Sequence, residues 1–140
     1  MREILFRGKA INRHKGYHRT SYKNGDWVYG LITRLYDERF ENLPAEMSDF
    51  GVNGIEVDYK TIEQYTGLTD KNGKKIFEGD ILKGSWNTVL IVFYDDISAS
   101  YRVKTPLGSE REISYYGDQN HLEIIGNIHD NPELLEGENE

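Results

Sequence analysis

The sequence predicts a mainly β fold, and two observations carry this prediction. Short runs of β-branched and aromatic residues recur along the chain, separated by Gly, Asn and Asp, which favour turns. The stretch at residues 65–82, YTGLTDKNGKKIFEGDIL, contains two reversals, at Asp70-Lys71-Asn72-Gly73 and at Glu78-Gly79-Asp80. Asn and Gly adopt positive φ at low steric cost, so the first reversal predicts a tight hairpin. Frequent turns with little helix are typical of a small barrel.

In the N-terminal half, two apolar runs predict core strands, at residues 4–6 and 27–32. Gly30 lies inside the second run and predicts a bulge or a close backbone approach. Between the two runs the sequence has no clear period, and Asn24-Gly25 marks a turn. One or two helical turns are expected near residues 44–47, within a long loop.

In the middle of the chain, residues 54–58 alternate apolar and polar side chains, as a half-buried strand does. Asp58 is expected to cap a single helical turn at residues 60–62. Residues 89–94 are the most β-prone run. Its unbroken apolarity predicts burial on both faces, or an edge covered by another element. Residues 100–104 alternate and are expected to form its hairpin partner.

Near the C-terminus, residues 112–115 predict a short strand and residues 122–128 the last strand. Asn131-Pro132 predicts an N-cap followed by a short helical turn. The elements together predict a β segment at residues 1–61 packed on a small barrel at residues 62–136. A frayed tail is expected at residues 137–140.

Composition limits the class of protein. At 140 residues and 37% hydrophobic content, the chain fits one domain, or one barrel with a smaller β appendage. It has no run of about 18 apolar residues that would predict a membrane span, and its start lacks a signal peptide's apolar region. The absence of cysteine excludes disulfides and thiolate metal sites. We therefore expect a cytoplasmic protein without membrane contact.

Charge is unevenly distributed along the chain. Residues 1–25 contain seven Lys or Arg and one acidic residue, which gives +6 and leaves −7 − 6 = −13 for the remainder. Such a split steers one surface toward an acidic partner, and another copy of the chain is one such partner. We therefore predict a homo-oligomer with head-to-tail contacts. Basic residues such as Arg13 and Arg19 are expected to face an acidic surface of the next copy, around a central Tyr or Trp.

The histidines do not predict a metal site. His14 and His18 are four residues apart, which would place both imidazoles on one face of a helix. The segment has few helix signals and no third ligand at a useful spacing. His129 lies beside the predicted helix start, where its imidazole is expected to hydrogen-bond the backbone.

The carboxylates and serines do not predict catalysis either. Asp95 and Asp96 are adjacent on a strand, so their side chains point to opposite faces and cannot form a dyad. Asp80 is expected to accept hydrogen bonds from local backbone amides beside Gly79. No serine lies in a nucleophile elbow, and no glycine pattern typical of phosphate binding occurs. We therefore expect no enzymatic activity and no cofactor.

The basic N-terminal stretch offers an alternative function, because aromatics among cations are typical of surfaces that bind single-stranded nucleic acid. The residues that would bind are Arg13, Lys15, Tyr17, Arg19, Tyr22 and Lys23. Against this alternative, Trp27 and Tyr29 alternate with Val28 and are expected to pack in a core or at a protein interface. The net charge of −7 also argues against general nucleic-acid binding.

Several segments resemble the YopX family, small proteins found mainly in phages and prophages of bacteria. The long stretch YTGLTDKNGKKIFEGDIL resembles the family signature, and its structural residues are Tyr65, Gly67, Leu68, Asn72, Gly73, Glu78, Gly79 and Asp80. MREILFRGK, DWVYG, GIEVDYKTIEQ and LEIIGNIHDNPELL resemble other family segments. The resemblance implies a mainly β protein with an SH3-like barrel, and it implies no catalytic or binding residues.

These observations predict a phage or prophage accessory protein that acts by binding or self-assembly. Nucleic-acid binding is the second interpretation, and an enzyme with an unrecognised site is the third. A protein partner other than a second copy cannot be named from the residues.

Overall fold

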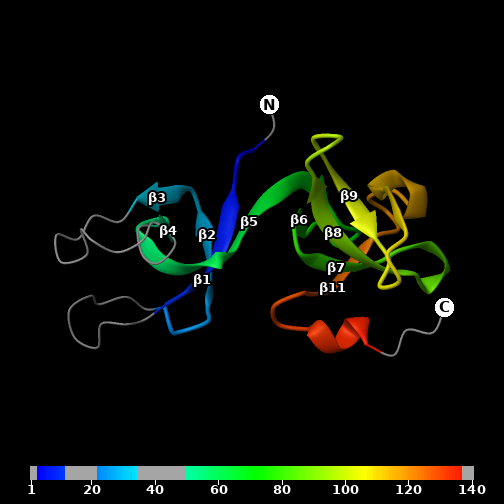
Figure 1. Ribbon diagram of the computed structural model, residues 1–140. Coiled ribbons are helices and arrows are strands. Elements are labelled where there is room, and N and C mark those ends of the chain that lie inside the picture. The colour runs from blue at the N-terminus through cyan, green and yellow to red at the C-terminus, as the bar shows by residue number, and fades with distance from the viewer. Residues whose placement is uncertain (1–2, 12–21, 35–49, 137–140) are drawn as a thin grey trace. The chain divides into compact units, whose positions relative to one another are not determined.

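The computed structural model describes residues 3–11, 22–34 and 50–136, which form two antiparallel sheets (Figure 1). The prediction of a mainly β chain is confirmed. The chain divides into two compact units, residues 1–64 and residues 65–140. The expected helical turns near residues 44–47 and the expected tail at 137–140 lie outside the described residues.

The N-terminal unit is built from short strands and the first part of one long strand. These are β1 (Phe6–Ala10), β2 (Trp27–Gly30), β3 (Ile32–Arg34), β4 (Phe50–Val52) and β5 (Ile55–Thr69). β1 lies between β2 and β5, and β4 lies between β5 and β3. The strand order is β2-β1-β5-β4-β3. β2 and β3 are therefore at opposite ends of this order, although only Leu31 separates them in the sequence.

Two local features of this unit correspond to sequence predictions. An added Cβ on Gly30 would lie 2.8 Å from Cβ of Asn53, so the predicted close approach is confirmed. The predicted helical turn at residues 60–62 is wrong, because β5 continues through them. Lys9 pairs with Asp58 but Arg7 pairs with Glu63, so β5 bulges between those positions. Asp58 Oδ1 accepts a hydrogen bond from Lys60 N–H there (3.1 Å).

The core of the N-terminal unit is small. Its buried members are Ala10, Val28, Val52 and Val57, with Tyr22, Ile55 and Ile62 packed against them. Val28 points inward because it alternates with Trp27 and Tyr29, as strand geometry requires.

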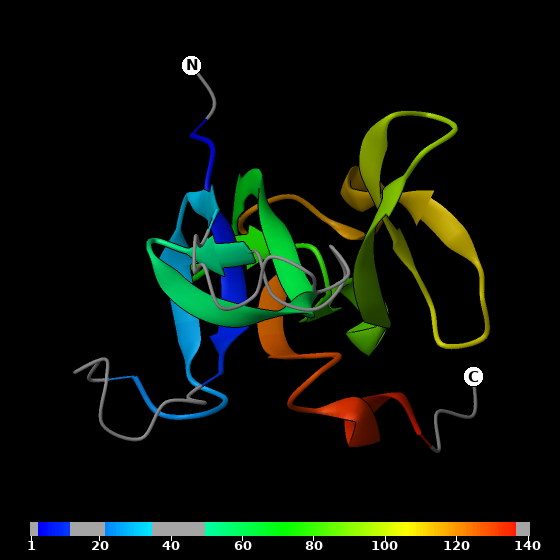
Figure 2. The same cartoon turned by 60° about the vertical axis from the view of Figure 1, so that its left-hand side comes forward.

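The C-terminal unit contains a hairpin and a five-stranded sheet (Figure 2). The end of β5 pairs with β6 (Lys75–Phe77). The sheet has the order β10-β9-β8-β7-β11, and its strands are β7 (Asp80–Lys83), β8 (Val89–Asp95), β9 (Ser100–Lys104), β10 (Glu110–Glu112) and β11 (Glu123–Asn127). Three single helical turns complete it: η2 (Ser85–Asn87), η3 (Ile113–Tyr116) and η4 (Pro132–Leu135).

The larger core lies on one face of this sheet. Leu82, Leu90, Val92 and Val103 come from neighbouring strands, and the other buried members are Ile76, Ile113, Tyr116 and Leu122. The predicted burial of residues 89–94 on both faces is wrong in part. Ile91 and Phe93 on the opposite face are only half-buried, and the Lys104 ammonium lies 5.3 Å from the Phe93 ring centroid.

Three other expectations for this unit need correction. The barrel expected at residues 62–136 is not closed, because no ladder joins β10 to β11 in the described chain. The strand expected at residues 112–115 ends at Glu112, since Ile113 and Tyr116 turn into the core three residues apart. The helical turn after Asn131 is present, but Asn131 does not cap it, and its Oδ1 accepts the Asn127 N–H instead (3.2 Å).

The signature hairpin has the predicted reversal at Asp70 to Lys74. Asp70 N–H donates to Lys74 O (2.8 Å), Gly73 N–H donates to Asp70 O (3.0 Å), and Gly73 has a φ of 77°. A Cβ on Gly73 would meet nothing within 4 Å, so a substitution there introduces backbone strain without a steric clash.

Gly73→Val is therefore expected to lower the free energy of unfolding by about 1 kcal/mol or more. Thermal or urea unfolding checks this, with Asn72→Ala as the control because Asn72 is an exposed neighbour in the same turn. An unchanged unfolding midpoint for Gly73→Val would contradict the left-handed assignment.

Candidate interaction surface

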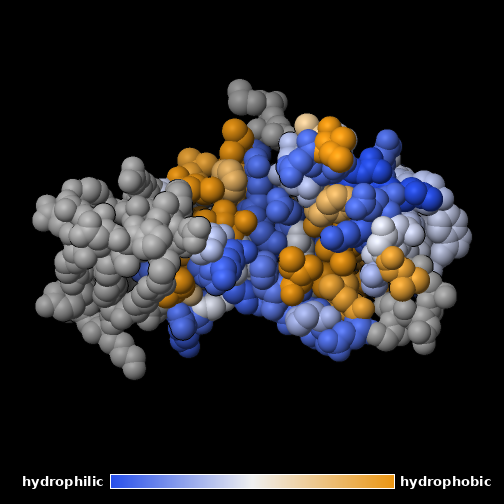
Figure 3. All heavy atoms as spheres, viewed as in Figure 1, coloured by the Kyte–Doolittle hydropathy of each residue, from blue (hydrophilic) through white to orange (hydrophobic). Residues whose placement is uncertain are grey.

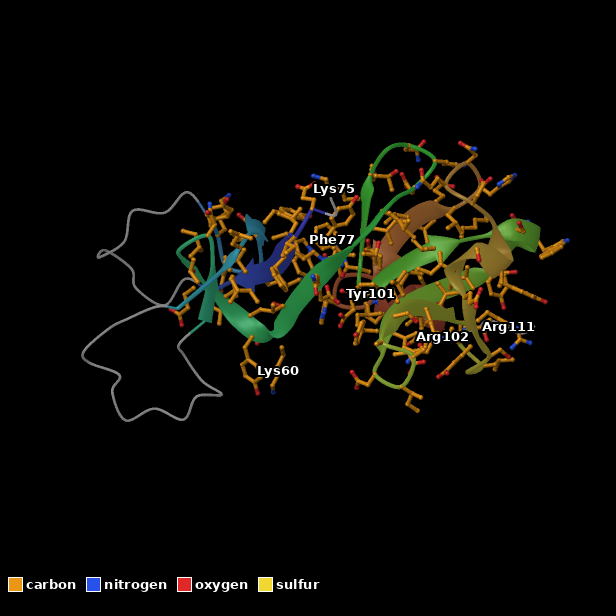
Figure 4. The ribbon with its side chains drawn as sticks, turned by 90° about the horizontal axis from the view of Figure 1, so that it is seen from above. Lys60, Lys75, Phe77, Tyr101, Arg102 and Arg111 are labelled. Atoms are coloured by element: carbon orange, nitrogen blue, oxygen red, sulfur yellow. The ribbon has the colours of Figure 1, made fainter. Side chains whose placement is uncertain are left out.

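The signature residues hold the hairpin in place. The Tyr65 ring packs 5.7 Å from the Phe77 ring, and Lys75 Nζ lies 5.7 Å from the Tyr65 centroid; Figure 4 shows Lys75 and Phe77 on β6. Gly67 has a φ of 91° within the irregular β5–β6 register, and Leu68 packs against the larger core. Asp80 Oδ2 accepts the Phe77 N–H (2.7 Å), which confirms the prediction of a local amide bond.

Most residues of the predicted nucleic-acid surface, Arg13, Lys15, Tyr17 and Arg19, lie outside the described residues, as do His14 and His18. The structure describes Tyr22 and Lys23. Tyr22 packs against the core of the N-terminal unit, and Lys23 is exposed, with its N–H donating to Asp26 Oδ2 (2.9 Å). Tyr22 therefore presents only part of its surface to solvent.

Two cations beside the Trp27 ring, Arg7 and Lys9, belong to the N-terminal unit. The Arg7 guanidinium carbon lies 4.5 Å from the Trp27 ring centroid and Lys9 Nζ lies 5.3 Å from it. Arg7 also donates to Glu63 Oε1 from Nε (3.1 Å) and Nη2 (3.0 Å), and both residues are only 5% exposed. Trp27 and its neighbours therefore stabilise this unit.

The two histidines in the described ranges, His121 and His129, each lie in a hydrogen-bonded turn. His121 Nδ1 lies 2.7 Å from Asp118 Oδ1, and both side chains are exposed. The Asn120 N–H and His121 hold the pKa of Asp118 below its ordinary value. His129 N–H donates to Asn127 Oδ1 (3.0 Å). Among the described residues, no three His, Cys, Asp or Glu side chains gather as metal ligands do.

The most unusual exposed side chain belongs to Trp86, in the turn between β7 and β8. It is 83% exposed, and its backbone is left-handed, with φ 60° and ψ 26°. The next residue, Asn87, is also left-handed at φ 58°. Such backbone costs about 1–2 kcal/mol for a residue with a Cβ. The turn therefore holds a large aromatic ring in solvent at an energetic cost.

Contacts on both sides of Trp86 fix the conformation of its turn. Gly84 N–H donates to Thr88 O (2.9 Å), and Thr88 Oγ1 donates to Ser85 O (2.9 Å). A Cβ on Gly84 would lie 2.9 Å from Tyr116 Cβ and 3.0 Å from Leu90 Cδ1, so the turn rests directly on η3 and the core. These contacts hold the turn that carries the Trp86 ring in a fixed conformation.

A second apolar side chain is exposed at the same end of the sheet. The turn between β9 and β10 exposes Leu107 by 69%. Thr105 closes this turn, since its N–H donates to Ser109 O (2.9 Å) and its O accepts the Gly108 N–H (2.9 Å). We call the turns at residues 84–88 and 105–109, with the strand residues that flank them, the Trp86 end.

The opposite end of the sheet, which we call the Ile97 end, comprises the turns at residues 95–99 and 78–79. Ile97 is 97% exposed. Asp95 holds the first turn, because Oδ1 accepts the Ile97 N–H (3.2 Å) and Oδ2 accepts the Ser98 hydroxyl (2.7 Å). Figure 3 shows hydrophobic atoms at the tip of the β8–β9 hairpin.

The Ile97 end carries acidic groups. Hydrogen bonds from the Ser98 hydroxyl and the Ile97 N–H hold the pKa of Asp95 below its ordinary value, so this carboxylate is ionised at neutral pH. Burial and the nearby charge of Asp96 raise the pKa of Glu78. Asp95 and Asp96, at the end of β8, thus form the charged rim of an apolar tip.

Sequence reasoning did not identify Trp86 or Ile97 as surface residues. The run Gly84-Ser85-Trp86-Asn87 contains turn-forming residues, which is a signal that Trp86 lies outside a strand. Its exposure depends on the left-handed backbone, which the composition does not specify.

The chain is similar to a protein family and to a solved structure. Residues 9–136 match the family model described as YopX protein. The crystal structure of protein EF1440 from Enterococcus faecalis is similar to this chain, with a TM-score of 0.54 and 22% sequence identity. The similarity covers 97% of this chain and 100% of EF1440, and it shows a shared fold. No curated protein matches. In the described parts of the chain, no helix is long and apolar enough to cross a membrane. Because the family match spans most of its length, this chain belongs to the YopX family.

Proposed function

We propose that this protein is a non-enzymatic binding module that assembles with copies of itself, with Trp86 as the anchor of the contact. The observation that carries the proposal is the 83% exposure of Trp86 on a left-handed residue. Strained backbone of this kind is retained where it serves a function, and tryptophan is enriched among residues that dominate interface energetics. Burial of this ring in a partner would supply most of the affinity.

Pairing of strand edges is a less suitable route to assembly. β10 forms one edge of the C-terminal sheet, is three residues long and consists of Glu110, Arg111 and Glu112. Short, charged edge strands resist pairing with another chain. Figure 4 shows Arg111 on this strand, and its guanidinium carbon lies 5.3 Å from the Tyr115 ring centroid. Side chains at the turns are therefore better placed to bind than the backbone at this edge.

We assign the module to a phage or prophage, acting in the cytoplasm of a bacterial host. Two observations support this assignment. The resemblance of the signature implied a family found mainly in phages and prophages, and the chain matches the model of that family. The similar solved structure is a protein from the bacterium Enterococcus faecalis.

Trp86→Ala is expected to convert the assembly to monomers, because the substitution removes the ring that the contact buries. Trp86→Gly should have the same effect without a loss of stability, since glycine relieves the left-handed strain. Sedimentation or light scattering at micromolar concentration measures the mass, with thermal unfolding in parallel. Tyr59→Ala is the matched control, because Tyr59 is an exposed aromatic in the N-terminal unit and should leave assembly intact.

A wild-type mass equal to the 16.3 kDa of one chain at low and moderate salt would contradict the proposal. The same titration with added single-stranded oligonucleotide tests the nucleic-acid alternative. Binding that weakens steeply as salt rises would support that alternative, since released counterions dominate such affinity.

A further inference from the structure

We infer that the copies assemble head to tail, with the Trp86 end of one copy packed against the Ile97 end of the next. This inference rests on the proposed self-assembly and names the surface that receives Trp86. Both ends belong to the C-terminal unit.

The two ends lie at opposite ends of the same strands. β8 begins after the Trp86 turn and finishes at the turn that carries Ile97. β9 then returns along β8, with Tyr94 opposite Tyr101, and finishes at the turn that carries Leu107. Figures 1 and 2 both show the β8–β9 turn at the far end of these strands from the β9–β10 turn. One copy therefore presents two separate apolar tips that face away from each other.

The Ile97 tip is ordered and apolar, as a contact surface requires. Besides the Asp95 hydrogen bonds, the Ser98 and Ser100 hydroxyl oxygens lie 2.7 Å apart, and Ala99 has a left-handed φ of 51°. The Tyr94 ring at the base of the turn is exposed in part and lies 5.2 Å from the Tyr101 ring in an edge-to-face arrangement. Figure 4 shows Tyr101 beside Arg102 on β9. Little conformational entropy remains to be lost when such a tip is covered.

Charge selects the partner for this tip. Asp95 and Asp96 lie in its turn and Glu78 is near Asp96, while the Arg102 cation is near Asp95. The carboxylates outnumber this cation, so two copies of the Ile97 end would repel each other in a two-fold contact. At the Trp86 end, Lys83 lies opposite Glu123 and Lys104 lies opposite Glu110, so the charges of the flanking strands balance. An end with balanced charges does not repel the carboxylates of the next copy as a second Ile97 end would. The favoured contact thus joins unlike ends.

A contact between unlike ends has a structural consequence. An open assembly retains one unused Trp86 end and one unused Ile97 end, on its two outermost copies, until it closes. The rotation between neighbours decides whether a ring or an open filament forms. The exposed charges set orientation and contribute little affinity, so added salt should weaken assembly only modestly.

Two variants that each inactivate one end test the inference. Trp86→Ala removes the apolar anchor from one end, and Ile97→Ser removes it from the other. Each variant alone should be monomeric, with at least a tenfold loss of apparent affinity. An equimolar mixture should form a species of two copies and no larger, because only one pair of intact ends remains. Tyr59→Ala mixed with either variant is the control and should leave larger assemblies.

The outcomes separate this inference from the proposed function. Wild-type assembly together with an unaffected Ile97→Ser variant would overturn the head-to-tail contact and leave the Trp86 proposal standing. Two monomeric variants whose mixture stays monomeric would also overturn it, since that result places both residues in one surface. A monomeric wild-type protein would overturn both. At concentrations below those at which the wild type assembles, the unfolding midpoints of the two variants should match that of the wild type, because both side chains are almost fully exposed.

Discussion

Glu63→Ala is expected to lower the free energy of unfolding by about 3–5 kcal/mol, because it leaves the Arg7 guanidinium buried without its counter-ion. Arg7 and Glu63 face each other across β1 and β5, and each is 5% exposed. Two hydrogen bonds, from Nε and Nη2, converge on Oε1 of Glu63. Denaturant unfolding with a probe in the N-terminal unit, such as the fluorescence of Trp27, measures the effect.

Replacing both partners should recover most of this loss. The double variant Arg7→Met with Glu63→Leu keeps a similar volume and removes both charges, which often leaves stability unchanged or raised. Met also retains an apolar contact with Trp27, where the guanidinium carbon now lies 4.5 Å from the ring centroid. With the single variants Arg7→Met and Glu63→Leu added, the double-variant loss minus the sum of the two single-variant losses gives the coupling energy.

A solvent-exposed ion pair provides the matched control. Lys71 Nζ lies 3.2 Å from Glu123 Oε2, and both side chains are partly exposed. Glu123→Ala should cost at most about 1 kcal/mol, because water solvates the lysine that remains. A Glu63→Ala loss no larger than the Glu123→Ala loss would show that solvent screens the Arg7 pair and would contradict its burial.

The sequence allowed the strands to be predicted where periodicity and turn chemistry agree. The run at residues 89–94 and the reversal at Asn72-Gly73 are both local signals, and both elements are present. Errors arose where tertiary packing decides the local conformation. Residues 113–116 have β-prone side chains, yet Ile113 and Tyr116 reach the core from one helical turn. The break in pairing opposite Arg7 and Lys9 similarly depends on two strands distant in sequence.

The candidate surface was less predictable than the fold. Composition indicated aromatic side chains at an interface, and their spacing among cations pointed to the N-terminal stretch. Trp27 instead packs against Arg7 and Lys9 within its own unit, whereas Trp86 is in solvent. The two residues differ through backbone angle and neighbouring strands, and neither factor can be read from the residue type. The carboxylates of Asp95 and Asp96 were evident in the sequence. Their neighbour Ile97 becomes part of a candidate surface only because its side chain is exposed, which the sequence does not indicate.

Asp70→Ala is expected to lower the free energy of unfolding by about 3 kcal/mol, because one carboxylate fastens the signature hairpin to the last strand. Oδ1 accepts the N–H groups of Asn72 and Lys74 (both 2.9 Å). Oδ2 accepts the N–H of Ile124 (3.0 Å), and Asp70 is 3% exposed. Each N–H donor that is left buried without its acceptor costs roughly 1–3 kcal/mol. The cost is lower for the donors in the exposed turn, because water can hydrate them. Asp70→Asn should cost less, since its amide oxygen keeps part of this network.

The pH dependence identifies the charged form as the stabilising one. Burial alone would raise the pKa of Asp70, but the hydrogen bonds from Ile124, Lys74 and Asn72 outweigh it and hold the pKa below its ordinary value. A carboxyl whose pKa is lower in the folded state stabilises the fold fully above the unfolded pKa, about 3.9. That contribution is lost as pH falls through the still lower pKa of the folded state.

The free-energy difference between wild type and Asp70→Asn should therefore be constant from neutral pH down to about pH 5. It should shrink as pH falls below about 4, where the wild-type carboxylate takes up its proton. Urea unfolding across this range measures it. Asp118→Asn is the matched control, because Asp118 accepts the Asn120 N–H in a similar turn (2.8 Å) but is exposed. A wild-type advantage over Asp70→Asn that persists unchanged to pH 2 would mean that the carboxyl stabilises the hairpin without its charge, and that the three amide bonds do not depend on ionisation.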